Sequence, residues 1–576
     1  MKTRYLIITL FIFYLFFSSC ESFLIEEPYT KITPGSFYLT EDGIKSGVNG
    51  LYSGLRSFYY TGFFLYMCEG QTDITKDAIA MDSEFKTWTI DATSSNVTAF
   101  WDACYVGINE TNTIIDVLEN QTIPKLDDNT RIRYLAESRF IRAHFYYHLV
   151  QQFGDIHLST EPTTTIETEA YKTSTDEVWN FIIDELKFCI DNLPEKYSAS
   201  EYGRITKYAA MHNLARVYLT CKRNNTGNLQ DAKSLCEDII KSGNYSLVES
   251  HEFLWDIANE KNSEIIFSVL FTQNTELNSG GNKLAVYFMC SYSEVYPSVV
   301  ARTIAYGRPW SRIRPTDFFI KLYNEDIDQR WDDCFRTEWH CNMPNARNNM
   351  FSPFTKQMEV VSWELGALAI KIPKKLWTAQ EILAAWPVIV FLPDSMTNKI
   401  TVQSVKNPNA EYSSNTFFQQ GLQYPSLVKH LDPLRTSVNS MDGSRDVCIF
   451  RLADTYLLAA EACYMLGELD RAAEYINVVR VRAAKPGKEQ EMKISSNDID
   501  LDFILNERGL ELIGEGHRWY DLKRTNKLYE RLTNPKINFA TAPLFRDFHV
   551  LRPIPRTQLT RISNPEDFKQ NPGYGD

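Results

Sequence analysis

The stretch at residues 449–483, IFRLADTYLLAAEACYMLGELDRAAEYINVVRVRA, constrains the fold more than any other part of this sequence. Apolar residues recur at steps of three and four before Gly467 and again after it, which predicts two helices folded back on each other. The order Tyr456, Ala460, Gly467, Ala472, Ile476 follows the template of the tetratricopeptide repeat (TPR). Such a hairpin cannot bury its apolar face alone, so the chain must supply further hairpins that pack against it.

Helical periodicity returns at several earlier places in the chain. Arg139 and Arg142 lie inside the most strongly helical of these stretches, so we expect each of them to find an acidic partner. Residues 61–95 lack periodicity, and we interpret them as loops. The stretches predicted to be helical are residues 37–60, 100–120, 131–153, 175–193, 208–221 and 229–241, and together they predict at least three helical hairpins.

Residues 242–440 differ in kind from the helical stretches. Their periodicity breaks up into segments rich in aromatic residues, Pro, Asn and Gly, such as NSGGNK, YGRPW and CNMPNARNNM. Long irregular segments in a folded chain usually carry function, so we expect this region to face a ligand. The last strongly helical stretch, residues 503–524, is predicted to be one continuous helix.

The charged residues of that last helix allow two interpretations. Glu511, His517 and Asp521 include the residue types of an acid, a base and an orienting group, as in a hydrolase. On a continuous helix, however, Glu511 and His517 would lie on different faces. We therefore favour ion pairs between neighbouring buried helices.

The composition excludes some classes of partner. The net charge is −13, whereas a nucleic-acid-binding protein requires a basic stripe, so we expect no nucleic-acid partner. Hydrophobic residues make up 44% of the chain, enough for a large core.

The N-terminus predicts export and lipidation. Lys2 and Arg4 precede a short apolar run that ends in Phe17-Ser18-Ser19-Cys20. Small residues before a cysteine resemble a lipobox, which makes residues 1–19 a signal peptide and Cys20 an acylated first residue that begins a tether over residues 20–35. Cleavage as a plain secretory signal is the alternative.

The remaining cysteines and acidic residues raise the question of metals. Cys334 and Cys341, with His340 beside them, allow a zinc site or a local disulfide, but zinc needs four ligands and only three are visible. Asp73, Asp77 and Asp82 form either a calcium site or a solvated acidic loop, and we favour the loop. We expect no cofactor and no metal centre.

Five features together resemble the SusD/RagB family of Bacteroidetes outer-membrane lipoproteins. They are the lipobox at Cys20, AESRFIRAHFYYHLVQQFGDIHL from residue 136, FRLADTYLLAAEACYMLG from 450, NERGLELIGEGHRWYDLKR from 506, and PIP at 553 with QNPGY at 570. The resemblance implies an all-α dominated, TPR-like superhelix of hairpins with an irregular, ligand-facing region. In that arrangement residues 36–241 form an N-terminal helical region, residues 242–440 face the ligand, and residues 441–576 pack on the TPR-like layer.

The same resemblance implies a function without catalysis. Family members capture glycans, and sometimes peptides, at the outer surface of the outer membrane and act as the lid of a SusC-like TonB-dependent transporter. Aromatic rings in loops can stack on sugars, and our candidates are Trp88, Tyr306, Trp310 and Trp339, which lie in loop-like, Gly/Pro-flanked sequence. Trp101, Trp179 and Trp519 lie among apolar helical neighbours and are assigned to the core. A peptide-capturing lid and a surface glycoside hydrolase remain the alternatives.

Overall fold

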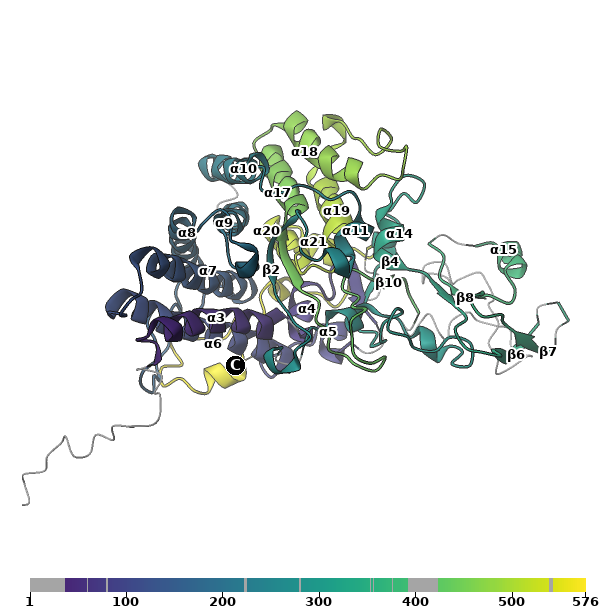
Figure 1. Ribbon diagram of the computed structural model, residues 1–576, viewed down its shortest axis with the longest axis horizontal. Helices are drawn as coiled ribbons and strands as arrows, with labels where there is room; N and C mark the ends of the chain where they lie inside the picture. Colours follow the sequence, from purple (N-terminus) through teal and green to yellow (C-terminus); the bar gives the residue numbers. More distant parts are fainter. Residues whose placement is uncertain are drawn as a thin grey trace, which may run out of the picture.

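The protein is a stack of helices from which a lobe rich in short strands projects (Figure 1). This computed structural model describes residues 37–575, except for 60, 79–80, 222–224, 279–280, 353, 356, 375–376, 392–422 and 538–541. The predicted signal peptide, the predicted lipidation site at Cys20 and the predicted tether over residues 20–35 therefore lie outside the described residues.

The predicted N-terminal helices are present, with bounds that differ from the predicted ones by a few residues. Caps explain several of the starts: the Ser174 side chain accepts a hydrogen bond from Glu177 N, and the Glu177 carboxylate accepts one from Ser174 N. The helices are α3 (Glu41–Tyr59), α6 (Ser95–Asn120), α7 (Asp128–Phe153), α8 (Thr175–Asn192), α9 (Lys207–Cys221) and α10 (Thr226–Lys241).

The region predicted to be loops before α6 contains short regular elements. They are α4 (Gly62–Cys68), β1 (Thr75–Asp77) and α5 (Ser83–Thr87). The interpretation of residues 61–95 as loops is therefore wrong in part, because single short turns carry too few residues to show a period.

The hairpin predicted over residues 449–483 is formed by α17 (Leu452–Met465) and α18 (Leu469–Arg482). Gly467 lies in the turn with φ +79°, a conformation that glycine adopts readily. Consecutive helices from α6 to α10 pack on one another, and α10 then packs on α17 (Figure 1). One TPR-like superhelix thus continues across the insertion between residues 242 and 451.

The C-terminal helices are α19 (Leu501–Leu512), α20 (Arg518–Arg524) and α21 (Leu528–Leu532). The prediction of one continuous helix over residues 503–524 is wrong. Gly514 and Gly516 both have positive φ values and turn the chain between α19 and α20.

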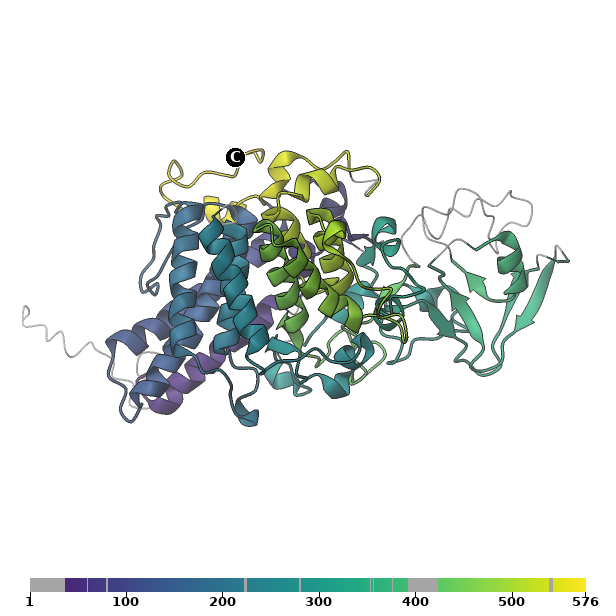
Figure 2. The same cartoon turned by 90° about the horizontal axis from the view of Figure 1, so that it is seen from above.

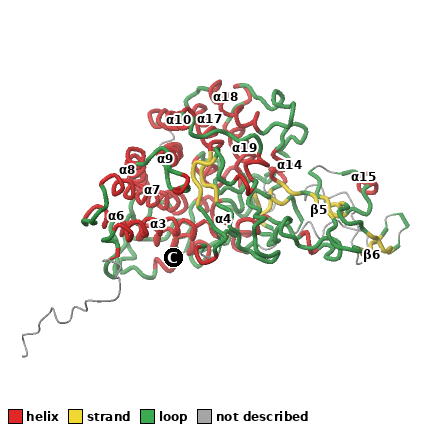
Figure 3. Tube along the Cα trace, in the orientation of Figure 1, coloured by secondary structure: helices red, strands yellow, loops and turns green. Residues whose placement is uncertain are grey.

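The strands are short and nearly all lie in the region predicted to be irregular (Figure 3). Four two-stranded sheets and one three-stranded sheet occur in the described part of the chain. The two-stranded pairs are β1 with β3 (Ile313–Pro315), β2 (Ile265–Val269) with β11 (Val447–Arg451), β4 (Phe335–Arg336) with β10 (Ser426–Leu427), and β6 (Arg347–Phe351) with β7 (Met358–Ser362). The three-stranded sheet joins β5 (Glu338–His340), β8 (Leu368–Lys371) and β9 (Ile389–Val390).

The remaining short helices connect these pieces. They are α11 (His251–Trp255), α12 (Leu284–Phe288), α13 (Asp317–Ile320), α14 (Arg330–Cys334), α15 (Ala379–Ala384) and α22 (Arg556–Leu559).

Two hydrophobic clusters hold the molecule together. The larger cluster runs through the helices and includes Trp101, Trp179 and Trp519, which confirms their assignment to the core. A second, smaller cluster includes Tyr292, Trp339 and Trp363 and takes further members from the strands of the projecting lobe, such as Met350 of β6 and Ile370 of β8. Figure 2 shows this lobe beside the helical body. The lobe thus has a core of its own, next to the helical body.

Candidate functional site

The loop at residues 301–312 carries two of the four aromatic residues predicted to bind ligand. Its end is fastened to α12 by backbone hydrogen bonds from Trp310 N to Val286 O (3.1 Å) and from Arg312 N to Tyr287 O (2.9 Å). The chain then enters β3, which pairs with β1. Rigid backbone therefore fixes the position of the side chains at residues 310–312.

Trp310 is partly buried and lies beneath a guanidinium group. The Arg312 guanidinium carbon is 4.5 Å from the centre of the Trp310 ring, a cation–π contact. Arg312 also pairs with Asp82 at 2.9 Å, and Tyr287 contacts Trp310 with a centroid separation of 5.1 Å. This group presents an apolar ring and polar hydrogen-bonding groups side by side.

Tyr306, in the middle of the same loop, repeats the contact between a ring and a guanidinium group. The Arg336 guanidinium carbon lies 5.2 Å from the centre of its ring. The Tyr306 hydroxyl accepts a hydrogen bond from His340 N (3.0 Å), and the ring meets Tyr292 edge to face. Tyr306 remains partly exposed, so a ligand can reach it.

Trp88 and Trp339 do not have the exposed position that their sequence context indicated. Trp339 is fully buried, with 0% of its surface exposed, and stacks on Tyr292 in the core of the lobe. Trp88 is 5% exposed and packs against Trp519, Phe545 and His549. The interpretation of these two rings as ligand-binding is wrong, because segments remote in sequence cover them.

The arginines that accompany the rings were not among the residues predicted to bind ligand. Arg312 and Arg336 were not among the candidates, although both lie over predicted ring positions. A signal was present: the segment YGRPWSRIRP places Arg308, Arg312 and Arg314 around Trp310 in one Pro-flanked loop.

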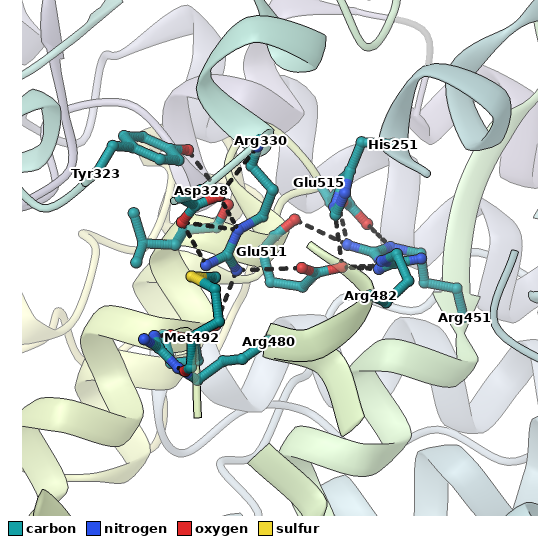
Figure 4. A network of polar contacts seen from close by, with 12 residues as sticks. His251, Tyr323, Asp328, Arg330, Arg451, Arg480, Arg482, Met492, Glu511 and Glu515 are labelled. Carbon is teal, nitrogen blue, oxygen red and sulfur yellow. Dashed lines mark hydrogen bonds and ion pairs between the residues drawn. The ribbon is translucent and has the colours of Figure 1, made fainter. Parts of the chain in front are cut away.

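Glu511, one of the acidic residues of the hydrolase interpretation, lies in a buried ion network (Figure 4). Glu511 is fully buried, and its carboxylate pairs with Arg451 (2.7 Å), Arg482 (2.5 Å) and Arg330 (3.2 Å). Although burial alone would raise the pKa of Glu511, His251, Arg482 and Arg451 hold it well below its usual range. A carboxylate kept ionised and enclosed in this way cannot serve as a general acid.

His517 and Asp521 belong to neighbouring buried contacts. His517 Nδ1 lies 3.1 Å from Arg216 Nη2, and burial lowers the pKa of His517 to about 4. Asp521 pairs with Arg508 (2.8 Å) and Arg524 (2.9 Å). The interpretation as buried charge pairing is confirmed for Glu511 and Asp521, whereas His517 contacts the cation Arg216 and forms no ion pair with an acidic group among the described residues.

The predicted partners of the α7 arginines are also present. Arg142 pairs with Glu185 at 2.8 Å, and Arg139 pairs with Glu119 at 2.5 Å. The expectation that both would find acidic partners is confirmed.

The acidic stretch near β1 is neither a calcium site nor a solvated loop as a whole. Asp73 is fully buried and pairs with Arg518 (2.6 Å) and Arg531 (2.7 Å). Asp82 forms an ion pair with Arg312 (2.9 Å). Within the described ranges, no group of three or more His, Cys, Asp or Glu side chains is placed to hold a metal ion.

Cys334 and Cys341 form neither a disulfide nor a zinc site. Both are free, buried thiols, and burial raises the pKa of Cys334 to about 12. They behave as small apolar side chains in their cores. In the part of the chain that the structure describes, no helix is long and apolar enough to cross a bilayer.

Comparison with known proteins places the chain in a family. A family model described as "SusD family" matches residues 263–574, and a second, described as "Starch-binding associating with outer membrane", matches residues 22–219. Among similar proteins, SusD-like protein P25 of Formosa agariphila is 26% identical over 590 residues, covering 100% of both chains. SusD-like protein P38 of the same organism is 24% identical and covers 89% of each chain.

Solved structures share the fold. A SusD homolog from Bacteroides thetaiotaomicron superposes with a TM-score of 0.69 at 20% identity, covering 95% of this chain and 100% of its own. A laminarin-binding SusD-like protein gives a TM-score of 0.63 at 21% identity, covering 93% of this chain and 100% of its own. With one family model matching more than half of the sequence and the fold shared over nearly all of it, the chain belongs to the SusD family.

Proposed function

We propose that this protein is a surface lipoprotein that captures a glycan and delivers it to a SusC-like TonB-dependent transporter, for which it acts as the lid. The observation that carries this proposal is the pair of partly buried rings on one fixed loop, Tyr306 and Trp310, each beneath a guanidinium group. Aromatic rings offer an apolar face to sugar C–H groups, and guanidinium groups donate hydrogen bonds to hydroxyls.

The relatives support a glycan as the cargo. One matching family model is described as starch-binding and associated with the outer membrane, and one protein of the same fold is named as laminarin-binding. On this basis the proposed ligand is an oligosaccharide or polysaccharide, and Tyr306 and Trp310 are its proposed contacts. The lipid anchor at Cys20, the outward orientation and the transporter partner belong to the same proposal.

The proposed role requires no catalysis. The acidic groups that a hydrolase would use, Glu511 and Asp521, are enclosed in ion pairs with arginines. A retaining or inverting glycosidase needs two carboxyl groups that face each other across the substrate. This burial supports binding over hydrolysis.

A polysaccharide panel tests the proposal directly. The purified chain is run through native gels that contain each polysaccharide, and the same mixtures are assayed for new reducing ends. Retention without new reducing ends is the expected result. New reducing ends would favour the hydrolase, and failure to bind any glycan would favour a peptide-capturing lid.

Variants at the ring pairs locate the site. Tyr306→Ala and Trp310→Ala should each weaken glycan binding by about five- to tenfold, because each removes one ring contact. Tyr171→Ala is the matched control, since Tyr171 is 53% exposed on a loop remote from the site in sequence. If Tyr306→Ala and Trp310→Ala bind the glycan as tightly as the control Tyr171→Ala, the loop at residues 301–312 is not the binding site.

A further inference from the structure

Four arginines gather around the Tyr292–Tyr306 pair, and we call them the arginine cluster: Arg302, Arg308, Arg336 and Arg435. Arg336 lies over the Tyr306 ring and donates a hydrogen bond to Ala305 O (2.7 Å). Arg435 donates to Ile304 O (3.1 Å), and Arg302 donates to Ser293 Oγ (3.3 Å). Burial is the main cause that lowers the pKa values of Arg308 and Arg435, and neighbouring charges add to it: Arg302 lowers the pKa of Arg308, and Arg308 lowers that of Arg435.

Few acidic groups balance this positive charge. Glu294 lies 3.5 Å from Arg302, but its side chain is 59% exposed. Asp432 lies near Arg435, yet its carboxylate already accepts hydrogen bonds from the backbone of Leu434 (2.7 Å) and Ser444 (2.6 Å). The cluster therefore carries an excess of positive charge on a protein whose net charge is −13.

Arg308 is the member of the cluster for which the described residues leave two guanidinium nitrogens without an acceptor. Its Nε and Nη1 atoms are shielded from solvent, and among the described residues neither atom has a hydrogen-bond partner. Burial and the charge of Arg302 lower the pKa of Arg308. Shielded guanidinium nitrogens without hydrogen bonds are unfavourable, so a group that supplies acceptor atoms at the partly exposed Arg308 would stabilise them.

The chemistry of that missing group follows from the guanidinium. Arginine presents a planar fork of donors that matches the paired oxygens of a carboxylate or sulfate group. Arg308 is two residues from Tyr306, whose ring is partly exposed. A sugar ring on Tyr306 would thus hold a negatively charged substituent within reach of Arg308.

We propose that the arginine cluster makes this site selective for acidic glycans, whose carboxylate or sulfate groups bind at Arg308. This inference rests on the proposed function, because it assumes that the loop at residues 301–312 receives the glycan. The inference specifies the chemical class of the glycan: its sugars are uronic acids or sulfated residues, not neutral sugars.

Matched polymers test the selectivity. One arm compares polygalacturonate with its carboxyl-reduced form, and the other compares a sulfated galactan with its desulfated form, using titration calorimetry on the full mature chain. In at least one arm, the charged polymer should bind about tenfold or more tightly than its neutral counterpart. The arm that shows the difference identifies the anionic group, and added salt should reduce that difference.

Substitutions at Arg308 assign the effect to the cluster. Arg308→Ala should remove most of the preference for the charged polymer, and Arg308→Lys should retain part of it, since lysine keeps the charge but loses the fork. The melting temperature of Arg308→Ala should stay the same or rise, because the change removes two shielded nitrogen atoms that have no acceptor among the described residues. Arg561→Ala, an exposed arginine in the C-terminal segment, serves as the control.

The outcomes separate this inference from the proposed function. Glycan binding that ignores the charge of the polymer, or that persists unchanged in Arg308→Ala, would overturn the inference and leave glycan capture intact. Failure to bind any member of either polymer pair or of the wider panel would overturn glycan capture itself, and the inference with it.

Discussion

The guanidinium of Arg451 shows how single residues stabilise this protein. It is 1% exposed and donates hydrogen bonds to Glu264, Glu511 and Glu515 at 2.7–3.0 Å (Figure 4). Burying these charges is costly, and only their mutual pairing compensates for the loss of solvation. Removing the central cation would leave three buried carboxylates short of partners.

Arg451→Ala should therefore lower the free energy of unfolding by about 3–5 kcal/mol, the usual cost of breaking a buried ion pair. Denaturant titration followed by circular dichroism measures the change. Arg471→Ala is the control, because Arg471 pairs with the exposed Glu474 and should cost less than about 1 kcal/mol. Similar losses in the two variants would contradict the view that the network is a main stabilising element.

Glu69 provides a pH-dependent test at the residue scale. Burial raises its pKa to about 7, one carboxylate oxygen accepts a hydrogen bond from Gly514 N (2.8 Å), and the other has no partner among the described residues. A pKa raised by folding means that stability present below the unfolded pKa is lost as the pH rises through 7. The variant Glu69→Gln has no ionisable group at this position, so it does not lose stability in this way as the pH rises.

The stability of Glu69→Gln minus that of the parent should therefore rise between pH 4 and pH 8 by an amount on the order of 3 kcal/mol. Melting temperatures of the two proteins across this range give the trend. A difference that stays constant with pH would mean that Glu69 ionises normally in the folded protein.

At the scale of elements, the corner between α19 and α20 has a clear structural cause. Gly516 has φ +79°, and a Cβ atom there would lie 2.4 Å from Phe64 Cζ. Gly467 has the same φ in the α17–α18 turn, but nothing lies within 4 Å of its Cβ position. A substitution at Gly467 therefore introduces backbone strain alone, whereas one at Gly516 introduces both backbone strain and steric overlap.

Gly516→Ala should lower the free energy of unfolding by at least about 2 kcal/mol, since strain and overlap add. Gly467→Ala should cost only about 1 kcal/mol from strain. Thermal unfolding of both variants makes the comparison. If Gly467→Ala lowers the free energy of unfolding as much as Gly516→Ala, close packing of the α19–α20 corner against Phe64 does not explain the need for glycine at position 516.

The helices were the most predictable elements, and the reason is local. Apolar periodicity and caps such as Ser174 with Glu177 depend only on residues that are close together in the sequence. For this reason α6 to α10 and the α17–α18 hairpin could be predicted. The break at Gly514 was missed because the apolar pattern continues on both sides of it. Whether glycine interrupts a helix depends on the surrounding packing, which periodicity does not report.

At the scale of the whole molecule, burial was the property that the sequence predicted least well. Trp88 was placed on a ligand surface because its neighbours are loop-like, yet Trp519, Phe545 and His549 cover it. Contacts between segments so far apart in the chain leave no local signal. Tyr306 and Trp310 come from the same reasoning and remain partly exposed.

The arrangement of the whole molecule matches a binding protein built on a scaffold. The TPR-like superhelix continues from α10 to α17 and leaves the intervening chain to form the lobe and the loop at residues 301–312 (Figures 1 and 2). Extended helical surfaces of this kind suit large protein partners. This supports the proposal that the helical body contacts a transporter while the loop region holds the glycan.

Affinity purification from native outer membranes tests the role of a transporter lid most directly. The full-length chain, tagged at its C-terminus, is extracted in mild detergent, and the proteins that accompany it are identified by mass spectrometry. We predict that a TonB-dependent transporter is recovered in equal amount, and that Cys20→Ala lowers the yield of the complex at the membrane. Recovery of the chain alone, with transporters only in the unbound fraction, would contradict the account.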